Sequence, residues 1–324
     1  MTDLASKKSK DLLADTNFKL FIEKLTEHEK VVSHLSLLEQ RKINAQLMAE
    51  YNKNCESIHR IENLEIPGVD KNKIPLRIYI PNESKKLPVL MYFHGGGWVF
   101  GSIDEADAVC RRLANHLGCI IASVEYRLAP EFPFPRPLED CYTATKWMAE
   151  NAYHFGGDNE NILVSGESAG GNLAAAVARM ARDKQGPKLS AQLLIYPVIS
   201  SLIQDAIYDQ CPDHYFLTKE DMKFFWNMYI QLPGEDKNPY ASLDFSSEFA
   251  HLPPALIITA EYDPLSYDIE KYAMQLQQAR VHVIKKTFPG LIHGFLYISL
   301  YEENQKAEWT KEIGALLREL GIFK

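Results

Sequence analysis

The chain has 324 residues, of which 46% are hydrophobic and 11% aromatic, enough apolar material for a large core, and this excludes a disordered chain. Its 35 Lys and Arg residues against 43 Asp and Glu residues give a formal net charge of −8. Because no basic excess is available to neutralise phosphates, we expect neither a nucleic-acid ligand nor stable association with an anionic membrane.

The N-terminal residues and the cysteines predict a cytoplasmic protein. Charged residues interrupt the apolar ones throughout residues 1–25, which is not the pattern of a signal peptide, and no stretch has the length and apolarity of a membrane span. An odd number of widely spaced cysteines indicates reduced thiols rather than a disulfide framework or a zinc site. The five are Cys55, Cys110, Cys119, Cys141 and Cys211.

About fifty residues at the N-terminus carry only helical patterns. Apolar residues recur there at helical spacing, first from Phe18 to Leu25 and then from Val31 to Leu38, before any strand pattern begins. We therefore assign residues 1–55 to the N-terminal part of a helical cap.

From about Ile58 onward, β-rich apolar runs alternate with amphipathic helical patterns, which predicts an α/β fold with a mostly parallel sheet and helices on both faces. A turn-like stretch at residues 67–72 joins the first two runs, so we expect them to form an antiparallel hairpin at one edge. Several later runs are continuously apolar, as central strands covered on both faces are. The eight predicted strands are residues 58–66, 74–80, 88–93, 119–124, 161–165, 191–196, 255–260 and 281–288.

A second segment without a strand pattern lies between the sixth and seventh predicted strands, at residues 199–252. It is too long for an ordinary connection, and Thr218, with two acidic residues close behind it, marks a helix start. We predict that this segment forms the second part of the cap. Residues 56–198 and 253–324 would then be the two parts of one core domain.

Aromatic side chains concentrate in this second cap segment. They fit the core of a helical subdomain and the lining of a substrate pocket equally well, and both interpretations stay open. The candidates for a pocket are Trp98, Tyr215, Phe216 and Trp226.

The sequence GESAG at residues 166–170 lies between the predicted strand 161–165 and a helical pattern that includes Leu173. A serine on such a tight strand-to-helix turn needs glycines two residues away on either side, where side chains have no room. The turn would lift the Ser168 hydroxyl above the carboxyl ends of the strands, at a helix N-terminus, which stabilises developing negative charge. Ser168 is therefore the candidate nucleophile.

The sequence HGGGW at residues 94–98 directly follows the predicted strand 88–93. Successive glycines let backbone N–H groups converge on one point, where they can stabilise an oxyanion; the alternative is a merely flexible turn. The predicted donors are Gly95, Gly96, Gly97 and Ala169. We expect His94 to order this loop rather than to act as the base, because it lies upstream of the nucleophile.

A serine nucleophile needs a base and an orienting carboxylate, each at the carboxyl end of a strand. Asp263 follows the seventh predicted strand and His293 follows the eighth, so these two complete a predicted triad. His282 lies within the last predicted strand and is expected to be structural. The competing acids are Glu261, which is too close to the strand end, and Asp268 and Glu270, which fall in the next helix.

Six motifs together resemble those of the hormone-sensitive-lipase group of α/β hydrolases. They are HGGGW at residues 94–98, YRLAPE at 126–131, PFP at 133–135, GESAGGN at 166–172, DPL at 263–265 and HGF at 293–295. The resemblance covers roughly residue 60 to the C-terminus, and it implies an eight-stranded α/β-hydrolase sheet with a helical cap. It also implies a carboxylic ester hydrolase that uses Ser168, Asp263 and His293 without a metal or organic cofactor.

Two positions depart from the pattern of the group, and both changes are conservative. Glu167 stands where the group usually has Asp or Thr, and Glu125 stands where Asp commonly precedes the motif that begins at Tyr126. Prolines hold the chain extended after that motif, so we interpret it as scaffold. Either Arg127 or Glu131 is a candidate to support the site by hydrogen bonds.

Apolar aromatics near the site favour a small-molecule ester of short to medium acyl chain as the substrate. Two alternatives stay open, namely a deacetylase or amidase that uses the same triad and a non-catalytic binding protein on the same scaffold. The protein would be a monomer or a homodimer. The eighth strand is a natural dimer edge, although Lys285 and Lys286 could equally protect it from pairing.

Overall fold

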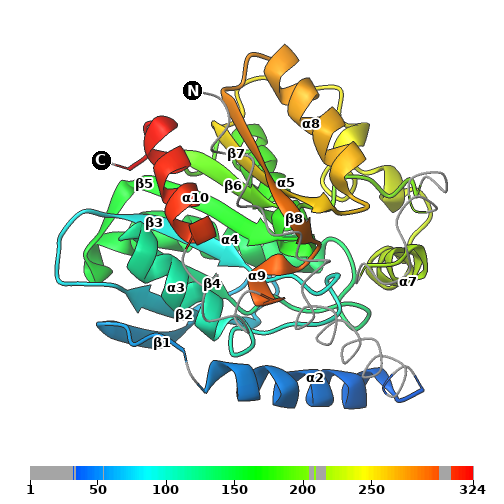
Figure 1. The fold of residues 1–324 in the computed structure, drawn as a ribbon, viewed down its shortest axis with the longest axis horizontal. Helices are drawn as coiled ribbons and strands as arrows, with labels where there is room; N and C mark the ends of the chain where they lie inside the picture. Colours follow the sequence, from blue (N-terminus) through cyan, green and yellow to red (C-terminus); the bar gives the residue numbers. More distant parts are fainter. Residues whose placement is uncertain are drawn as a thin grey trace.

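The computed structural model describes residues 32, 34–53, 55–203, 208, 217–298 and 308–323. Its centre is an eight-stranded sheet in the order β1-β2-β4-β3-β5-β6-β7-β8 (Figure 1). β2 runs in the opposite direction to the other seven strands, so the predicted mostly parallel α/β sheet is confirmed. The strands are β1 Arg60–Pro67, β2 Lys73–Ile80, β3 Leu87–Phe93, β4 Ile120–Val124, β5 Gly157–Glu167, β6 Ala191–Ile195, β7 Ala255–Tyr262 and β8 Val283–Ile292.

The two edges of the sheet are those expected. β1 and β2 form an antiparallel hairpin, whose turn is closed by the Gly68 N–H donating to the Asn72 carbonyl at 2.8 Å. β8 is the other edge strand and continues four residues beyond the predicted end, to Ile292. Pro289 and Gly290 resemble a strand terminus, but an edge strand tolerates a proline because only one of its sides is paired.

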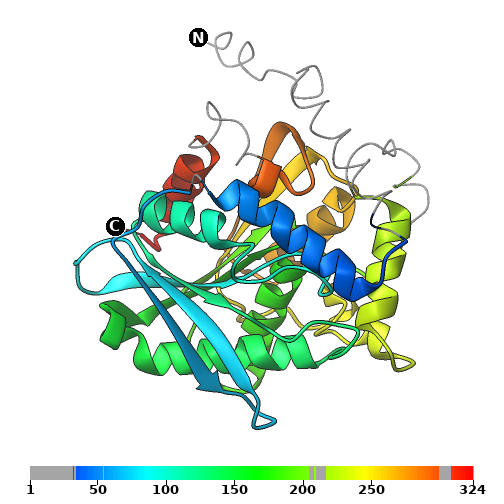
Figure 2. The same ribbon diagram turned by 90° about the horizontal axis from the view of Figure 1, so that it is seen from below.

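Helices cover both faces of the sheet. α3 and α10 lie together on one face, and α4 and α5 pack against each other on the opposite face (Figures 1 and 2). The helices are α2 Leu37–Asn52, α3 Asp107–Leu117, α4 Arg136–Asn151, α5 Ala169–Asp183, α7 Lys219–Tyr229, α8 Ser266–Gln278, α9 Phe295–Ile298 and α10 Glu308–Glu319. Short 3₁₀ turns are η2 Ala152–Phe155, η3 Glu235–Lys237 and η4 Leu243–Phe245.

The core lies between these layers, as the continuously apolar strands require. Every residue of β4 and β6 is buried, because helices cover both faces of these strands. Within the described ranges, no helix is long and apolar enough to cross a membrane. Cys55, Cys110, Cys119 and Cys141 carry free thiols, and Cys211 lies outside the described residues.

Two helices outside the alternating core begin with matched caps. At α7, the Thr218 side chain accepts from the Asp221 N–H while the Asp221 carboxylate accepts from the Thr218 N–H, which confirms the predicted helix start. Ser36 and Glu39 do the same at α2. Figure 2 shows α2 reaching from beside α3 towards α7.

Candidate active site

The predicted site residues all follow the carboxyl ends of parallel strands. Ser168 follows β5, the glycine run follows β3, Asp263 follows β7 and His293 follows β8. Because these strands run in one direction, their carboxyl ends meet at one edge of the sheet, which is where ligands of open α/β sheets bind.

The turn that carries Ser168 is strained and sterically closed. Ser168 has φ 55° and ψ −119°, a conformation that non-glycine residues rarely adopt. A Cβ at Gly166 or at Gly170 would overlap the carbonyl oxygen of Phe93, which is why both positions are glycine. The Ser168 N–H donates to the Ile195 carbonyl at 3.0 Å, so neighbouring strands hold the turn in place.

Ser168, His293 and Asp263 form a connected chain of hydrogen bonds. The Ser168 Oγ lies 2.9 Å from His293 Nε2, and His293 Nδ1 lies 2.8 Å from Asp263 Oδ2. Both partners of the serine are buried, each with an exposed fraction of 4%. The other carboxylate oxygen of Asp263 accepts from the Leu265 N–H at 2.9 Å, so the acid is itself held in place. Since a carboxylate only accepts, Nδ1 carries the proton and Nε2 is free to accept the serine proton.

The competing acids and the second histidine have other partners or positions. Glu261 accepts from the Gly290 N–H at 2.7 Å, and Glu270 pairs with Lys285. Asp268 lies in α8 and faces Asp244. The exposed His282 precedes β8 rather than lying within it.

The glycine run after β3 folds into a tight turn, which we call the oxyanion loop (residues 94–101). The N–H groups of Val99 and Phe100 both donate to the Gly96 carbonyl, at 3.0 and 2.8 Å. Gly96 and Gly97 have φ values of 103° and 61°, and a Cβ at Gly97 would overlap the ring of Phe225 from α7. The loop therefore requires glycine for its backbone conformation and for its close contact with α7.

One of the four predicted oxyanion donors is already engaged. The Gly95 N–H donates to Glu167 Oε1 at 2.5 Å, so it does not point at a substrate. Among the described residues, the N–H groups of Gly96, Gly97 and Ala169 make no hydrogen bond. These three N–H groups are therefore available to other acceptors.

His94 lies inside the oxyanion loop and not beside Ser168. Its Nδ1 donates to the Gly95 carbonyl at 2.9 Å, and its ring stacks on Tyr126 with centroids 4.3 Å apart. The Tyr126 hydroxyl donates to the His94 carbonyl at 2.7 Å. Burial lowers the pKa of His94 to about 4, so the ring is neutral near neutral pH and serves to order the loop.

Glu167, which was noted in the sequence only as a departure from the family pattern, occupies a central place. It is buried, with an exposed fraction of 1%, directly before Ser168. Its Oε1 accepts from the Gly95 N–H and, at 2.8 Å, from the hydroxyl of Tyr297 in α9. Burial raises the pKa of Glu167 to about 7. Its position next to the serine was the one sequence signal that could have identified it.

Arg41 of α2 was not predicted, yet it binds the outer side of the oxyanion loop. It donates to the Val99 carbonyl at 2.8 Å, to the Ala129 carbonyl at 2.6 Å and to both carboxylate oxygens of Glu131 at 2.9 Å. Glu131 thus supports the loop through Arg41. Arg127 instead binds Asp140 and Asp70, away from the triad.

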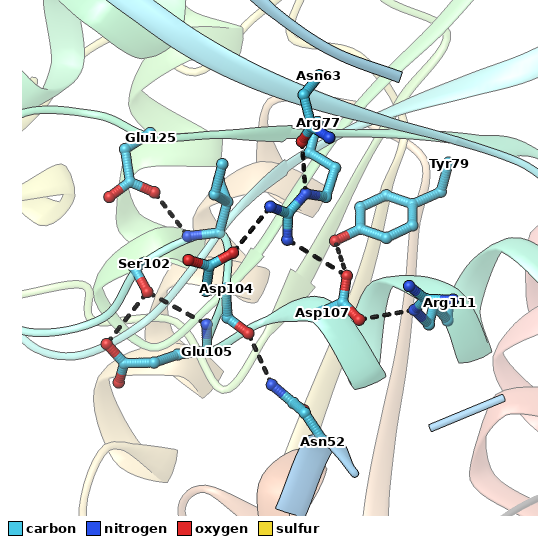
Figure 3. Close-up of polar contacts among 11 residues, drawn as sticks. Asn52, Asn63, Arg77, Tyr79, Ser102, Asp104, Glu105, Asp107, Arg111 and Glu125 are labelled. Atoms are coloured by element: carbon cyan, nitrogen blue, oxygen red, sulfur yellow. Dashed lines mark hydrogen bonds and ion pairs between the residues drawn. The ribbon is translucent and has the colours of Figure 1, made fainter. Parts of the chain in front are cut away.

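Polar contacts also anchor the segment that follows the oxyanion loop (Figure 3). Asn52 at the end of α2 donates to the Asp104 carbonyl at 2.6 Å, and Arg77 pairs with the Asp104 carboxylate at 2.8 Å. Glu125 accepts from the Ile103 N–H at 2.6 Å, so the glutamate that replaces the usual aspartate has a defined structural partner.

The aromatic pocket candidates that the structure describes pack on one another. Trp98 stacks on Tyr229 with centroids 4.2 Å apart and planes at 4°, and it lies 4.8 Å from Trp226. Trp98 and Trp226 have exposed fractions of 0% and 6%, so they serve here as the core that joins α7 to the oxyanion loop. Tyr215 and Phe216 lie outside the described residues.

Comparison with known proteins places these features in a family. A family model described as the alpha/beta hydrolase fold matches residues 90–297. The chain is 37% identical to a carboxylesterase of Mycobacterium tuberculosis over 267 residues, which is 81% of this chain and 83% of the relative. It is also 37% identical to an arylesterase of Saccharolobus solfataricus over 253 residues, covering 78% and 80%.

Solved structures agree with these relatives. A hyperthermophilic esterase from the archaeon Pyrobaculum calidifontis superposes with a TM-score of 0.85 at 36% identity, over 95% of this chain and 99% of that one. The sequence motifs, the strand order and these similarities agree: the chain belongs to the α/β hydrolase fold family, in its hormone-sensitive-lipase group.

Proposed function

We propose that this protein is a serine carboxylesterase that hydrolyses short- to medium-chain esters through an acyl-enzyme on Ser168. The class of reaction is supported by relatives and matched structures that are named esterases. The single observation that carries the residue assignment is the continuous hydrogen-bond chain from the Ser168 Oγ through His293 to Asp263.

In the first step His293 Nε2 takes the proton of Ser168 as the Oγ attacks the ester carbonyl. Asp263 holds the imidazole in the required tautomer and stabilises its charged form. The resulting oxyanion accepts from the free N–H groups of Gly96, Gly97 and Ala169, and His293 then protonates the departing alcohol. Water, activated by the same imidazole, releases the acid and regenerates Ser168.

We also propose that residues 1–55 and 199–252 form the two parts of a cap above this edge of the sheet. Contacts made by two helices favour this proposal. α2 contacts the oxyanion loop through Arg41 and α7 contacts it through Phe225. A cap of this kind limits the length of the acyl chain that enters. The free thiols of the described cysteines support a cytoplasmic location.

The proposal is tested by replacing Ser168 with Ala and measuring hydrolysis of p-nitrophenyl esters from acetate to palmitate. We expect the variant to lose at least about a thousandfold in kcat, as triad deletions do, and the wild type to prefer butyrate or hexanoate. Residual turnover close to the wild-type rate would refute the assignment of the nucleophile. A preference for palmitate emulsions would refute the proposed chain length.

A further inference from the structure

Glu167 connects three segments that the reaction uses. It is joined by one peptide bond to Ser168, and its Oε1 accepts from the N–H of Gly95 in the oxyanion loop. The same oxygen accepts from the hydroxyl of Tyr297, in the helix that begins two residues after His293. A single carboxylate oxygen therefore ties the nucleophile turn, the oxyanion loop and the histidine segment to one point.

We propose that Glu167 is a positioning residue for ester hydrolysis, which holds the oxyanion loop and the segment after His293 in register with Ser168. This inference rests on the proposed function, since it assumes that Ser168 is the nucleophile. Glu167 does not touch the reacting atoms, because its Oε1 is occupied by Gly95 and Tyr297 and its side chain is buried beneath the turn.

The direction in which the Gly95 N–H points explains why this bond matters. With Gly95 held by Glu167, the next two N–H groups of the loop, at Gly96 and Gly97, are left without partners among the described residues. Oxyanion donors contribute most when their positions are fixed before the charge develops, and loss of one donor costs about a hundredfold or more in kcat. Without the bond from Gly95 to Glu167, the positions of the Gly96 and Gly97 N–H groups would no longer be fixed.

The charge on Glu167 makes this positioning dependent on pH. An ionised carboxylate accepts hydrogen bonds more strongly than a protonated one, so the ionised form holds the two donors better. Within the part of the chain that the structure describes, each titratable group that faces Glu167 is an acid whose pKa burial raises, and all are neutral near pH 7. They are Tyr92 of β3, Cys110 of α3, Tyr126 after β4, Tyr196 after β6 and Tyr297 of α9.

Three substitutions test the role of the side chain. Glu167→Asp withdraws the carboxylate by one methylene and should lower kcat about a hundredfold while KM stays within about twofold, because donor positions and not substrate contacts change. Glu167→Gln keeps an oxygen for both donors and should lose only about tenfold. Tyr297→Phe removes one of the two bonds and should also lower kcat. Tyr272→Phe is the matched control, since it removes a buried tyrosine hydroxyl that has no partner among the described residues.

The pH profile of kcat/KM separates positioning from a merely structural role. The acid limb of the wild type should include the ionisation of Glu167, and Glu167→Gln should lack it. An acid limb of the same shape in Glu167→Gln as in the wild type, or a kcat of Glu167→Asp within about twofold of the wild type, would overturn the inference. Thermal unfolding confirms that each variant is folded, and Glu167→Gln keeps the test open if Glu167→Asp does not fold.

The same assay distinguishes this inference from the proposed function. If Ser168→Ala is inactive but both Glu167 variants behave as the wild type does, only the role of Glu167 falls. If Ser168→Ala keeps its activity, the nucleophile assignment falls, and with it the assumption on which the role of Glu167 rests.

Discussion

At the scale of single residues, the site depends on positions where a side chain would not fit. Gly97 has a positive φ and lies against the ring of Phe225, while Gly95 and Gly96 face Glu167 and Phe100. The absence of side chains lets the backbone turn closely enough to present successive N–H groups. The function of this loop therefore lies in its backbone.

Replacing Gly97 with Ala should lower kcat about a hundredfold, with KM almost unchanged, because the new Cβ displaces the loop and its N–H donors. Steady-state kinetics on p-nitrophenyl butyrate check this. Gly234→Ala is the matched control, since Gly234 also has a positive φ, of 88°, but has nothing within 4 Å of the added Cβ. Equal losses in the two variants would show that backbone strain alone, and not the position in the oxyanion loop, causes the effect.

At the scale of elements, α2 braces the oxyanion loop and the segment that follows it. Arg41 binds the Val99 carbonyl near one end of the helix. At the other end, Asn52 binds the Asp104 carbonyl, as Figure 3 shows. The Arg41 side chain is only 21% exposed, so its donors to Glu131 and to two carbonyls are partly shielded from solvent. The helix and the loop are therefore expected to move together.

Substituting Arg41 with Ala should lower kcat by about tenfold, because displacing a catalytic loop even slightly is costly. Arg41→Lys should fall between Ala and wild type, since a lysine cannot reproduce the planar fork of donors. Arg60→Ala is the control, as it removes an arginine that pairs with Glu62 at an exposed site. Wild-type kcat in Arg41→Ala would contradict a bracing role for α2.

At the scale of the whole molecule, three carboxyl groups are buried or half-buried, and of these only Asp268 has a cation, Lys271, that partly stabilises its charge. Burial raises the pKa of Glu167 and of Glu105 to about 7 and that of Asp268 to about 6. In each case the folded protein binds the proton more tightly than the unfolded chain does. Burial lowers the pKa of His94 to about 4, so this one group binds its proton less tightly in the folded protein than in the unfolded chain. Its effect on the free energy of unfolding is opposite to that of the three carboxyl groups and is confined to pH values below about 6.5.

The free energy of unfolding should therefore fall as the pH rises from about 5 to 8, because the folded state loses protons there that the unfolded state has already lost. Glu167 alone would contribute about 3 kcal/mol to this fall. Urea unfolding at pH 5, 6, 7 and 8 measures it, and Glu167→Gln should flatten the curve. A free energy of unfolding that rises over this range would contradict the prediction.

The amino-acid sequence by itself determined the sheet, its edges and the three residues that the structure joins in one hydrogen-bond chain. Alternating apolar runs predicted all eight strands, because burial on two faces demands continuous hydrophobicity. The motifs around Ser168, Asp263 and His293 placed each residue after a strand, and in a parallel sheet such positions must share one edge. Local patterns were sufficient for these features.

Only the tertiary structure decided which N–H groups remain free and what holds the loops. That the Gly95 N–H is engaged by Glu167, 72 positions away in the chain, and that Arg41 reaches Val99, 58 positions away, follows from packing between distant segments. Likewise, Trp98 and Trp226 become one buried cluster only when α7 lies on the oxyanion loop. Hydrophobic periodicity records which face of an element is buried but carries no information about which distant polar group will meet it.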